Sequence, residues 1–271
     1  MTEWMFVVGL AVLTLAFRSS GHPLLRHLFL PSFLATAFCI GYFASGHTWV
    51  GLLCILVWPL LPWLELLTRV RNMRLPTHKE LRPMPPPSSH TFPALEELTQ
   101  EVEAEGFEFV RDAGWEWEMF RQQFRLFYRS EDRATAAICL SFQNNLSFYH
   151  VSISSRQTDG RTWMTWNYPF PATMKLPPTL RLNRQKPDLS FFDLYQDHIG
   201  FLSANGVETT QLLDQTEESL LAFIEEDMRR QIDHNLRAGI LQPVDGSVVR
   251  YSLRGLFYIW TQFLMDTLRV R

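Results

Sequence analysis

The sequence predicts an α+β protein in which N-terminal transmembrane helices are followed by a cytoplasmic antiparallel sheet packed with helices. Two patterns predict this fold class. Residues 28–64 contain no Asp, Glu, Lys or Arg, and residues 115–167 alternate apolar and polar side chains between short turns. Uncharged runs of this length are typical of membrane segments, and a period of two is typical of strands.

Charge divides the chain into three expected parts. Residues 1–68 are membrane segments with no net charge, residues 69–89 are a basic, Pro-rich linker of charge +4, and residues 90–271 are a soluble α+β domain. The whole chain carries −3, so the soluble domain carries −7. Residues 236–255 resemble the wing of a winged-helix domain in their order of helix, strand, hairpin and polar turn. The acidic charge nevertheless argues against a nucleic-acid partner.

The uncharged run is too long for one crossing of a membrane. As a single helix, residues 28–64 would extend about 55 Å, against a hydrocarbon core of about 30 Å. Small and polar residues at 45–48 interrupt the run, so we expect a helical hairpin of residues 28–44 and 49–67. Pro59 and Pro62 predict a bend in its second arm.

An earlier apolar segment, residues 4–17, predicts a short helix. Its length of about 21 Å is short for a full crossing, so the membrane part has two or three segments. A signal peptide is the alternative. Against it, Glu3 precedes the segment and no small-residue cleavage site follows.

Basic residues flank the hairpin on both sides, and its turn has no Arg or Lys. We expect Arg69, Arg71 and Arg74 to lie at the membrane surface, together with Trp58 and Trp63 as interfacial aromatic residues. The positive-inside rule then makes the soluble domain cytoplasmic. The predicted location is the cell inner membrane, as a multi-pass protein with membrane lipid as one partner.

Periodicity predicts the first half of the soluble domain. We expect a helix at residues 93–106, a strand at 107–110 and a turn at 112–114. The alternating segments that follow predict an antiparallel meander, in a sheet of about five strands. One face of this sheet should pack on helices, and the other should be partly open.

The second half of the domain is expected to be mainly helical. Residues 168–186 lack a clear period and predict a surface loop, and the expected helices and small hairpin follow at 190–203, 216–239, 240–251 (the hairpin) and 253–268. The last helix is amphipathic. We expect it to cover the sheet, and the alternative is that it lies on the membrane.

Four residues form the predicted ligand site. Trp163 and Trp166 lie on opposite faces of one expected strand, and Arg161 lies in the hairpin before it. His198 lies on the apolar stripe of the next helix. An exposed tryptophan beside polar groups is suited to an apolar ligand, and core packing is the alternative for at least one of the two.

Catalytic motifs are not found. The sequence contains no GxSxG, SxxK, GxGxxG or Walker A pattern. Cys39, Cys54 and Cys139 form no CxxC pair, which indicates a reducing compartment. The histidines lack metal-ligand spacing, so we expect no metal and no cofactor.

These patterns favour a membrane-anchored, non-catalytic module. It would bind a protein partner or a small ligand at the inner membrane face, alone or as a subunit of a larger assembly. Two alternatives stay open. One is a membrane-anchored enzyme with His150, His198 or His234 as acid–base groups. The other is a lipid-surface sensor that uses the C-terminal helix.

Overall fold

The structure is a computed structural model that describes residues 2–20, 22, 25, 27–88, 90–143 and 146–268. The chain forms two compact units. The helical unit comprises Met1–Met73, Pro171–Thr173 and Arg250–Arg271, and the α+β unit comprises Arg74–Phe170 and Met174–Val249.

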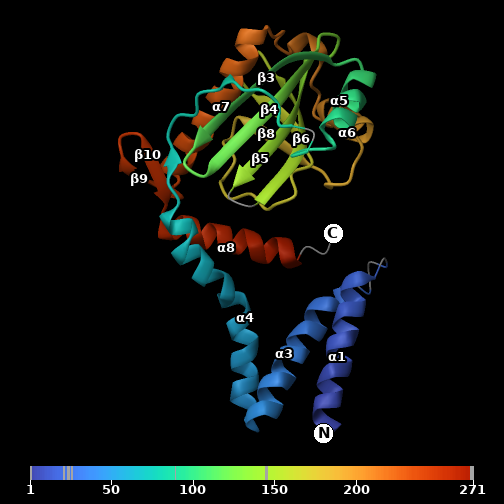
Figure 1. The fold of residues 1–271 in the computed structure, drawn as a ribbon, viewed down its shortest axis with the longest axis vertical. Helices are drawn as coiled ribbons and strands as arrows, with labels where there is room; N and C mark the ends of the chain where they lie inside the picture. Colours follow the sequence, from blue (N-terminus) through green and yellow to red (C-terminus); the bar gives the residue numbers. More distant parts are fainter. Residues whose placement is uncertain are drawn as a thin grey trace. The chain divides into compact units, whose positions relative to one another are not determined.

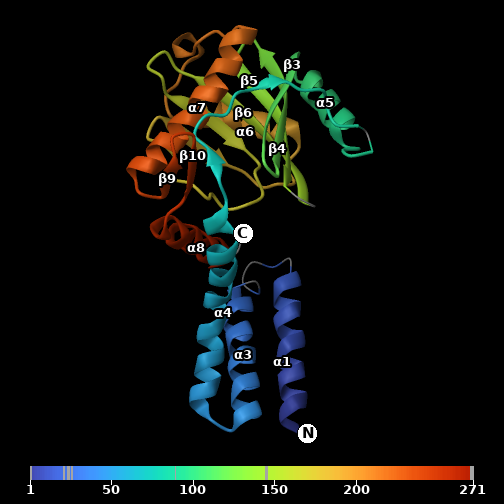
Figure 2. The same cartoon turned by 60° about the vertical axis from the view of Figure 1, so that its left-hand side comes forward.

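The helical unit contains the helices expected from the apolar segments, which are α1 (Thr2–Ser19), α3 (Phe29–Ser45) and α4 (Thr48–Thr68). It also contains the 3₁₀ turn η1 (Val70–Asn72) and α8 (Leu253–Leu268). In Figures 1 and 2, α1, α3 and α4 lie side by side. Gly46 ends α3 in the left-handed region with φ 70°, which a glycine adopts at little cost. The expected break at residues 45–48 is therefore confirmed.

Helix α4, taken together with η1, bends by 45° between its halves, Thr48–Val57 and Pro59–Asn72. Pro59 and Pro62 lie inside the helix, where each lacks the backbone donor of a regular turn. Among the described residues, no single helix is long and apolar enough to cross a membrane, whereas the two halves of α4 together meet those criteria.

Helices α3 and α4 approach each other closely at two glycines. A Cβ atom on Gly41 would lie 2.8 Å from the Val50 carbonyl oxygen and 2.6 Å from the Cys54 Sγ. A Cβ on Gly51 would lie 2.7 Å from the Phe38 ring. Small residues at such a crossing allow the two backbones to approach each other, as is common between membrane helices.

The α+β unit contains a seven-stranded sheet in the order β2-β3-β4-β5-β6-β7-β8. Its strands are β2 (Arg82–Pro83), β3 (Glu108–Trp117), β4 (Phe120–Arg129), β5 (Ala134–Gln143), β6 (Leu146–Arg156), β7 (Thr162–Trp166) and β8 (Leu180–Arg184). Neighbouring strands are antiparallel from β2 to β7, and β8 pairs with β7 in parallel. The expected meander is confirmed for β3 to β7.

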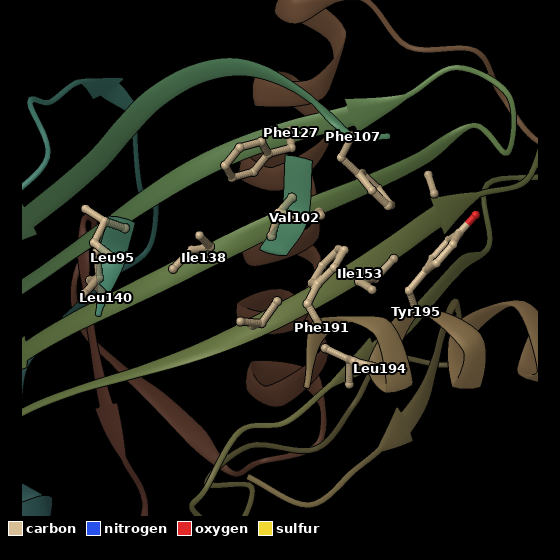
Figure 3. Packing of buried hydrophobic residues seen from close by; sticks show 13 residues of the cluster. Leu95, Val102, Phe107, Phe127, Ile138, Leu140, Ile153, Phe191, Leu194 and Tyr195 are labelled. Carbon is tan, nitrogen blue, oxygen red and sulfur yellow. The ribbon is translucent and has the colours of Figure 1, made fainter. Parts of the chain in front are cut away.

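Helices cover both faces of this sheet, because the central strand β5 buries side chains in both directions. Ile138 and Leu140 lie in the core shared with α5 (Leu95–Ala104) and α6 (Phe191–Ala204). Figure 3 shows Val102 of α5 and Phe191 of α6 among the strand side chains of this core. Cys139 points to the opposite face, toward Leu220 of α7 (Glu217–Arg237). The expectation of a partly open face is wrong over the central strands.

Both longer helices begin where their capping residues predict. The Ser190 side chain accepts a hydrogen bond from the Asp193 amide at the start of α6. Thr216 forms a capping box with Ser219 at the start of α7. Each cap satisfies backbone donors that the first helical turn leaves free.

Two strands of the large sheet lie where the sequence indicated no strand. Strand β2 lies in the predicted linker, and β8 lies in the predicted surface loop at 168–186. β2 has two residues and β8 has five, and each is an edge strand of the sheet. Short edge strands bury too little apolar surface to produce a clear alternation, which is why the estimate of about five strands was too low.

The expected turn at residues 112–114 is wrong, because these residues continue strand β3. Gly114 suggested a turn, but here it allows a close approach of another segment. A Cβ at this position would lie 2.6 Å from the Gln122 carbonyl oxygen and 2.8 Å from the Met84 Sδ. The chain turns instead after Trp117, where Glu118 has φ 51°.

The expected hairpin at 240–251 is confirmed as β9 (Leu241–Asp245) and β10 (Val248–Tyr251). A third strand, β1 (Leu75–Pro76), pairs with β10 and completes a small sheet. Helix α8 was expected to cover the large sheet, and this expectation is wrong. It belongs to the helical unit, where the Trp260 Nε1 donates a 2.6 Å hydrogen bond to the Pro59 carbonyl oxygen of α4.

We predict that Gly41→Ala destabilises the helical unit by about 1–3 kcal/mol, because the added methyl group overlaps the backbone of α4. Gly9→Ala in α1 is the matched control, since a Cβ there meets nothing within 4 Å. Both changes replace glycine with alanine inside a helix and raise helix propensity equally. The difference in stability between the two variants therefore reports the close contact of α3 with α4. Thermal unfolding of the full chain in detergent, followed by circular dichroism, measures it. Equal melting temperatures of the two variants would contradict the close approach of α3 and α4 at Gly41.

Candidate membrane surface and ligand site

The helical unit exposes large apolar side chains along its described length. They include Met5 at 72 % exposure and Leu64 at 73 %. Others on α1, α3 and α4 are Phe6, Val8, Val12, Leu15, Ile40, Trp49, Leu52, Leu56, Leu60 and Leu61. Water-soluble proteins rarely expose contiguous apolar surface of this extent. We call these side chains of α1, α3 and α4 the apolar belt.

Charged groups are confined to the ends of these helices. Glu3 lies in the first turn of α1 and Arg18 in its last turn. Helix α3 has no charged residue, and the one in α4 is Glu65, which pairs with Arg69 at 3.3 Å. Thr14 and Thr36 are buried between α1 and α3, and their hydroxyl oxygens lie 3.3 Å apart. Polar groups inside the bundle are therefore paired.

The predicted membrane-surface residues follow the bend of α4 in the chain. The side chains of Arg69, Arg71 and Arg74 are exposed. The Trp63 ring lies 6.0 Å from the Trp260 ring of α8. The side chain of Trp58 lies outside the described residues.

The four predicted ligand residues do not come together in one site. Trp163 and Trp166 do point to opposite faces of β7, as the period of two predicts. Trp163 is only 4 % exposed and packs with Leu202 in the core. Its Nε1 donates a 2.8 Å hydrogen bond to Gln157. Trp166 lies on the other face, beside the His150 ring.

His198 is a core residue of α6 and is fully buried. Its Nε2 lies 3.1 Å from the Ser155 hydroxyl and its Nδ1 lies 3.0 Å from the Thr165 hydroxyl. Burial lowers the pKa of His198 to about 3, which keeps the ring neutral. Arg161 is exposed and forms an ion pair with Asp159 at 2.6 Å. Of the predicted four, only Arg161 and Trp163 border one shared groove.

The three candidate acid–base histidines are also separate. His150 lies across the sheet from His198, because it pairs in register with Cys139 on the α7 face. Burial lowers the pKa of His150 to about 4, and its Nδ1 has no hydrogen-bond partner among the described atoms. His234 lies near the end of α7. Among the residues that the structure describes, no three His, Cys, Asp or Glu side chains form a metal-binding group.

A buried ion-pair network joins β6 to α7, and the sequence did not indicate it. The Arg156 side chain is 5 % exposed and its guanidinium lies 2.7 Å from the Asp227 carboxylate and 3.7 Å from Glu226. The same guanidinium donates to the Phe223 carbonyl oxygen and lies over the Phe223 ring. Burial raises the pKa of Asp227, and Arg156 partly offsets that shift. The arrangement compensates a buried charge and fixes α7 on the sheet.

No protein-family model, curated protein or solved structure matches the chain. Its function therefore has to be inferred from its own residues.

We predict that the α+β unit loses stability as pH falls below 6.5. His198 and His150 have pKa values lowered to about 3 and about 4 in the folded state, so protons bind the unfolded state preferentially. Each histidine should lower the free energy of unfolding by about 2 kcal/mol between pH 6.5 and 5. Urea unfolding of the full chain in detergent, followed by tryptophan fluorescence, measures this slope.

The matched variant is His198→Gln, which keeps polar groups near Ser155 and Thr165 but cannot take up a proton in this range. It should remove about half of the pH slope that the two histidines cause. An unchanged slope would show that His198 is accessible to protons in the folded state.

Proposed function

We propose that the chain is a membrane-anchored, non-catalytic module. Its helical unit would lie in the cell inner membrane, and its acidic α+β domain would bind a protein partner or small ligand at the cytoplasmic face. The observation that carries this proposal is the apolar belt, which exposes large side chains on helices that have charges only at their ends. Hydrocarbon solvates such a surface better than water does.

The length and bend of α4 support membrane insertion. The helix has 21 residues, or about 31 Å, close to the thickness of a hydrocarbon core. Bends at proline are tolerated in membranes where neighbouring groups satisfy the freed backbone. At the bend itself, the Trp260 indole donates a hydrogen bond to the Pro59 carbonyl oxygen.

Charge asymmetry supports the cytoplasmic orientation. Arg69, Arg71 and Arg74 follow α4, whereas the α3–α4 turn at Gly46 and His47 has no Arg or Lys. Basic residues next to membrane helices are retained on the cytoplasmic side.

The separation of the histidines favours a binding module over an enzyme that uses them. His150 and His198 lie on opposite faces of the sheet, and both rings are neutral and buried. General acid–base catalysis needs a group that exchanges protons near the working pH and reaches a substrate.

We predict that the full chain sediments with membranes and resists alkaline carbonate. The double variant Leu53→Arg/Leu56→Arg should lose most of this association, because each arginine costs about 2.5–3.5 kcal/mol at the centre of a membrane helix. Leu53→Phe/Leu56→Phe is the matched control and should remain inserted.

A reporter fused after Arg271 should be active in the cytoplasm. If the full chain stays dissolved without detergent, or the reporter works only outside the cytoplasm, the proposed anchoring or orientation is wrong.

A lipid-surface sensor is the second candidate, and one observation favours it. Helix α8 exposes Leu253, Phe257 and Phe263 at 58 %, 53 % and 42 %, while Trp260 fixes it to α4. An apolar helix face held beside membrane helices is suited to the lipid interface.

We predict that lipid protects the amides of α8 from hydrogen exchange when the full chain is placed in nanodiscs. Trp260→Glu should remove most of this protection, because a carboxylate is poorly solvated at the interface and cannot donate to Pro59. Trp260→Phe loses the hydrogen bond but remains apolar, so it separates the two effects. Equal exchange in detergent-free nanodiscs for all three chains would exclude the sensor.

A further inference from the structure

A cavity of about 330 Å³ lies at the β2–β3 edge of the sheet. Its walls come from the segment around β1 and β2 and from the end of β3. The residues that matter here are Lys79, Arg82, Met84, Trp115 and Trp117. This volume is at the lower end of the range for small-molecule pockets. We call this cavity the Lys79 site.

Lys79 brings a positive charge to this cavity. Its Nζ lies 4.3 Å from the centre of the Trp115 ring. The side chain is half-buried, and burial lowers its pKa to about 8. Among the described residues, no carboxylate forms an ion pair with Lys79, and its ammonium group has no hydrogen-bond acceptor. A half-buried cation whose described partner is an aromatic ring is incompletely compensated.

Trp117 supplies a second donor without a partner. Its Nε1 is buried and has no hydrogen-bond acceptor among the described atoms. The neighbouring Trp115 differs, because its Nε1 donates a 3.0 Å hydrogen bond to Gln122. Buried donors of this kind are rarely left unsatisfied in folded proteins. Lys79 and the Trp117 side chain both belong to the cavity wall, and an anionic oxygen would complement the Lys79 charge.

The other charged groups of the cavity wall do not provide this complement. Glu80 is paired with Arg82 at 2.9 Å, and both side chains are mostly exposed. Glu116 and His78 are exposed members of the wall. Pro76, Met84 and the indole rings make the remaining wall largely apolar.

We propose that the Lys79 site binds the carboxylate or phosphate group of a small ligand, whose apolar part lies against Trp115 and Met84. Lys79 donates to the anionic oxygens. This specifies the small ligand of the proposed binding module and rests on that proposal for its biological setting. Soluble anions and anionic lipid headgroups share this chemistry, and the experiment separates them.

The chain offers a direct test because it has three lysines, Lys79, Lys175 and Lys186. The full chain in detergent is treated with a trace of acetic anhydride, and mass spectrometry compares acetylation of the three amines. Benzoate or inorganic phosphate should reduce the labelling of Lys79 several-fold and leave Lys175 and Lys186 unchanged. If the anion comes from a lipid headgroup, Lys79 should be protected in nanodiscs that contain phosphatidylglycerol. Nanodiscs of phosphatidylcholine alone are the control and should give no protection.

Variants connect this protection to the cavity. Calorimetric binding of benzoate should be lost in Lys79→Met and retained in the matched variant Lys186→Met, whose side chain is exposed. The proposal is wrong if all three lysines are protected equally. It is also wrong if benzoate, phosphate and phosphatidylglycerol all fail to protect Lys79.

Failure of this site and failure of the anchoring can be told apart. A chain that sediments with membranes but shows no protection of Lys79 contradicts the site alone. A chain that dissolves without detergent but protects Lys79 contradicts the anchoring alone.

Discussion

The separation of apolar surface from charge is the constraint on which this protein depends. Helices α1, α3 and α4 present large apolar side chains outward and keep charged groups at their ends. The α+β unit instead has an acidic surface and buries apolar side chains on both faces of its sheet. One solvent cannot favour both surfaces, since apolar groups avoid water and charges avoid hydrocarbon. The proposed membrane location gives each unit the medium that its surface requires.

Burial on both faces of the sheet makes the α+β unit sensitive to its polar interior. Strand β5 is enclosed by α5 and α6 on one face and α7 on the other, and its residues 134–140 are buried. Arg156 is tolerated because Asp227 and the Phe223 carbonyl oxygen complete its contacts. His198 is tolerated because two hydroxyl groups accept or donate at its ring nitrogens. The same enclosure lowers the histidine pKa values and removes these rings from acid–base chemistry.

Elements with many buried residues were predictable from the sequence, and elements held mainly by strand pairing were not. Uncharged length located α3 and α4, because these helices have almost no charged side chains. Alternation located β3 to β7, because it reflects a buried face. Strands β2 and β8 are held by backbone pairing at the sheet edges, which leaves little trace in side-chain order. The period of two correctly placed Trp163 and Trp166 on opposite faces. It therefore also implied that they could not share one pocket, and Trp163 is the one that packs in the core.

The Lys79 site was missed because its residues lie in a segment whose charge has a simpler explanation. Basic residues after a membrane helix are expected from topology alone, so Lys79 was counted with Arg69 and Arg71. The structure instead groups residues from Arg74 onward with the α+β unit. The Leu81 amide donates to Glu225 of α7, and Gln123 of β4 donates to the Pro85 carbonyl oxygen. A segment fixed to the domain by such bonds is part of its fold rather than a free spacer. Its lysine can therefore be held at a defined position over Trp115, which a flexible tether could not achieve.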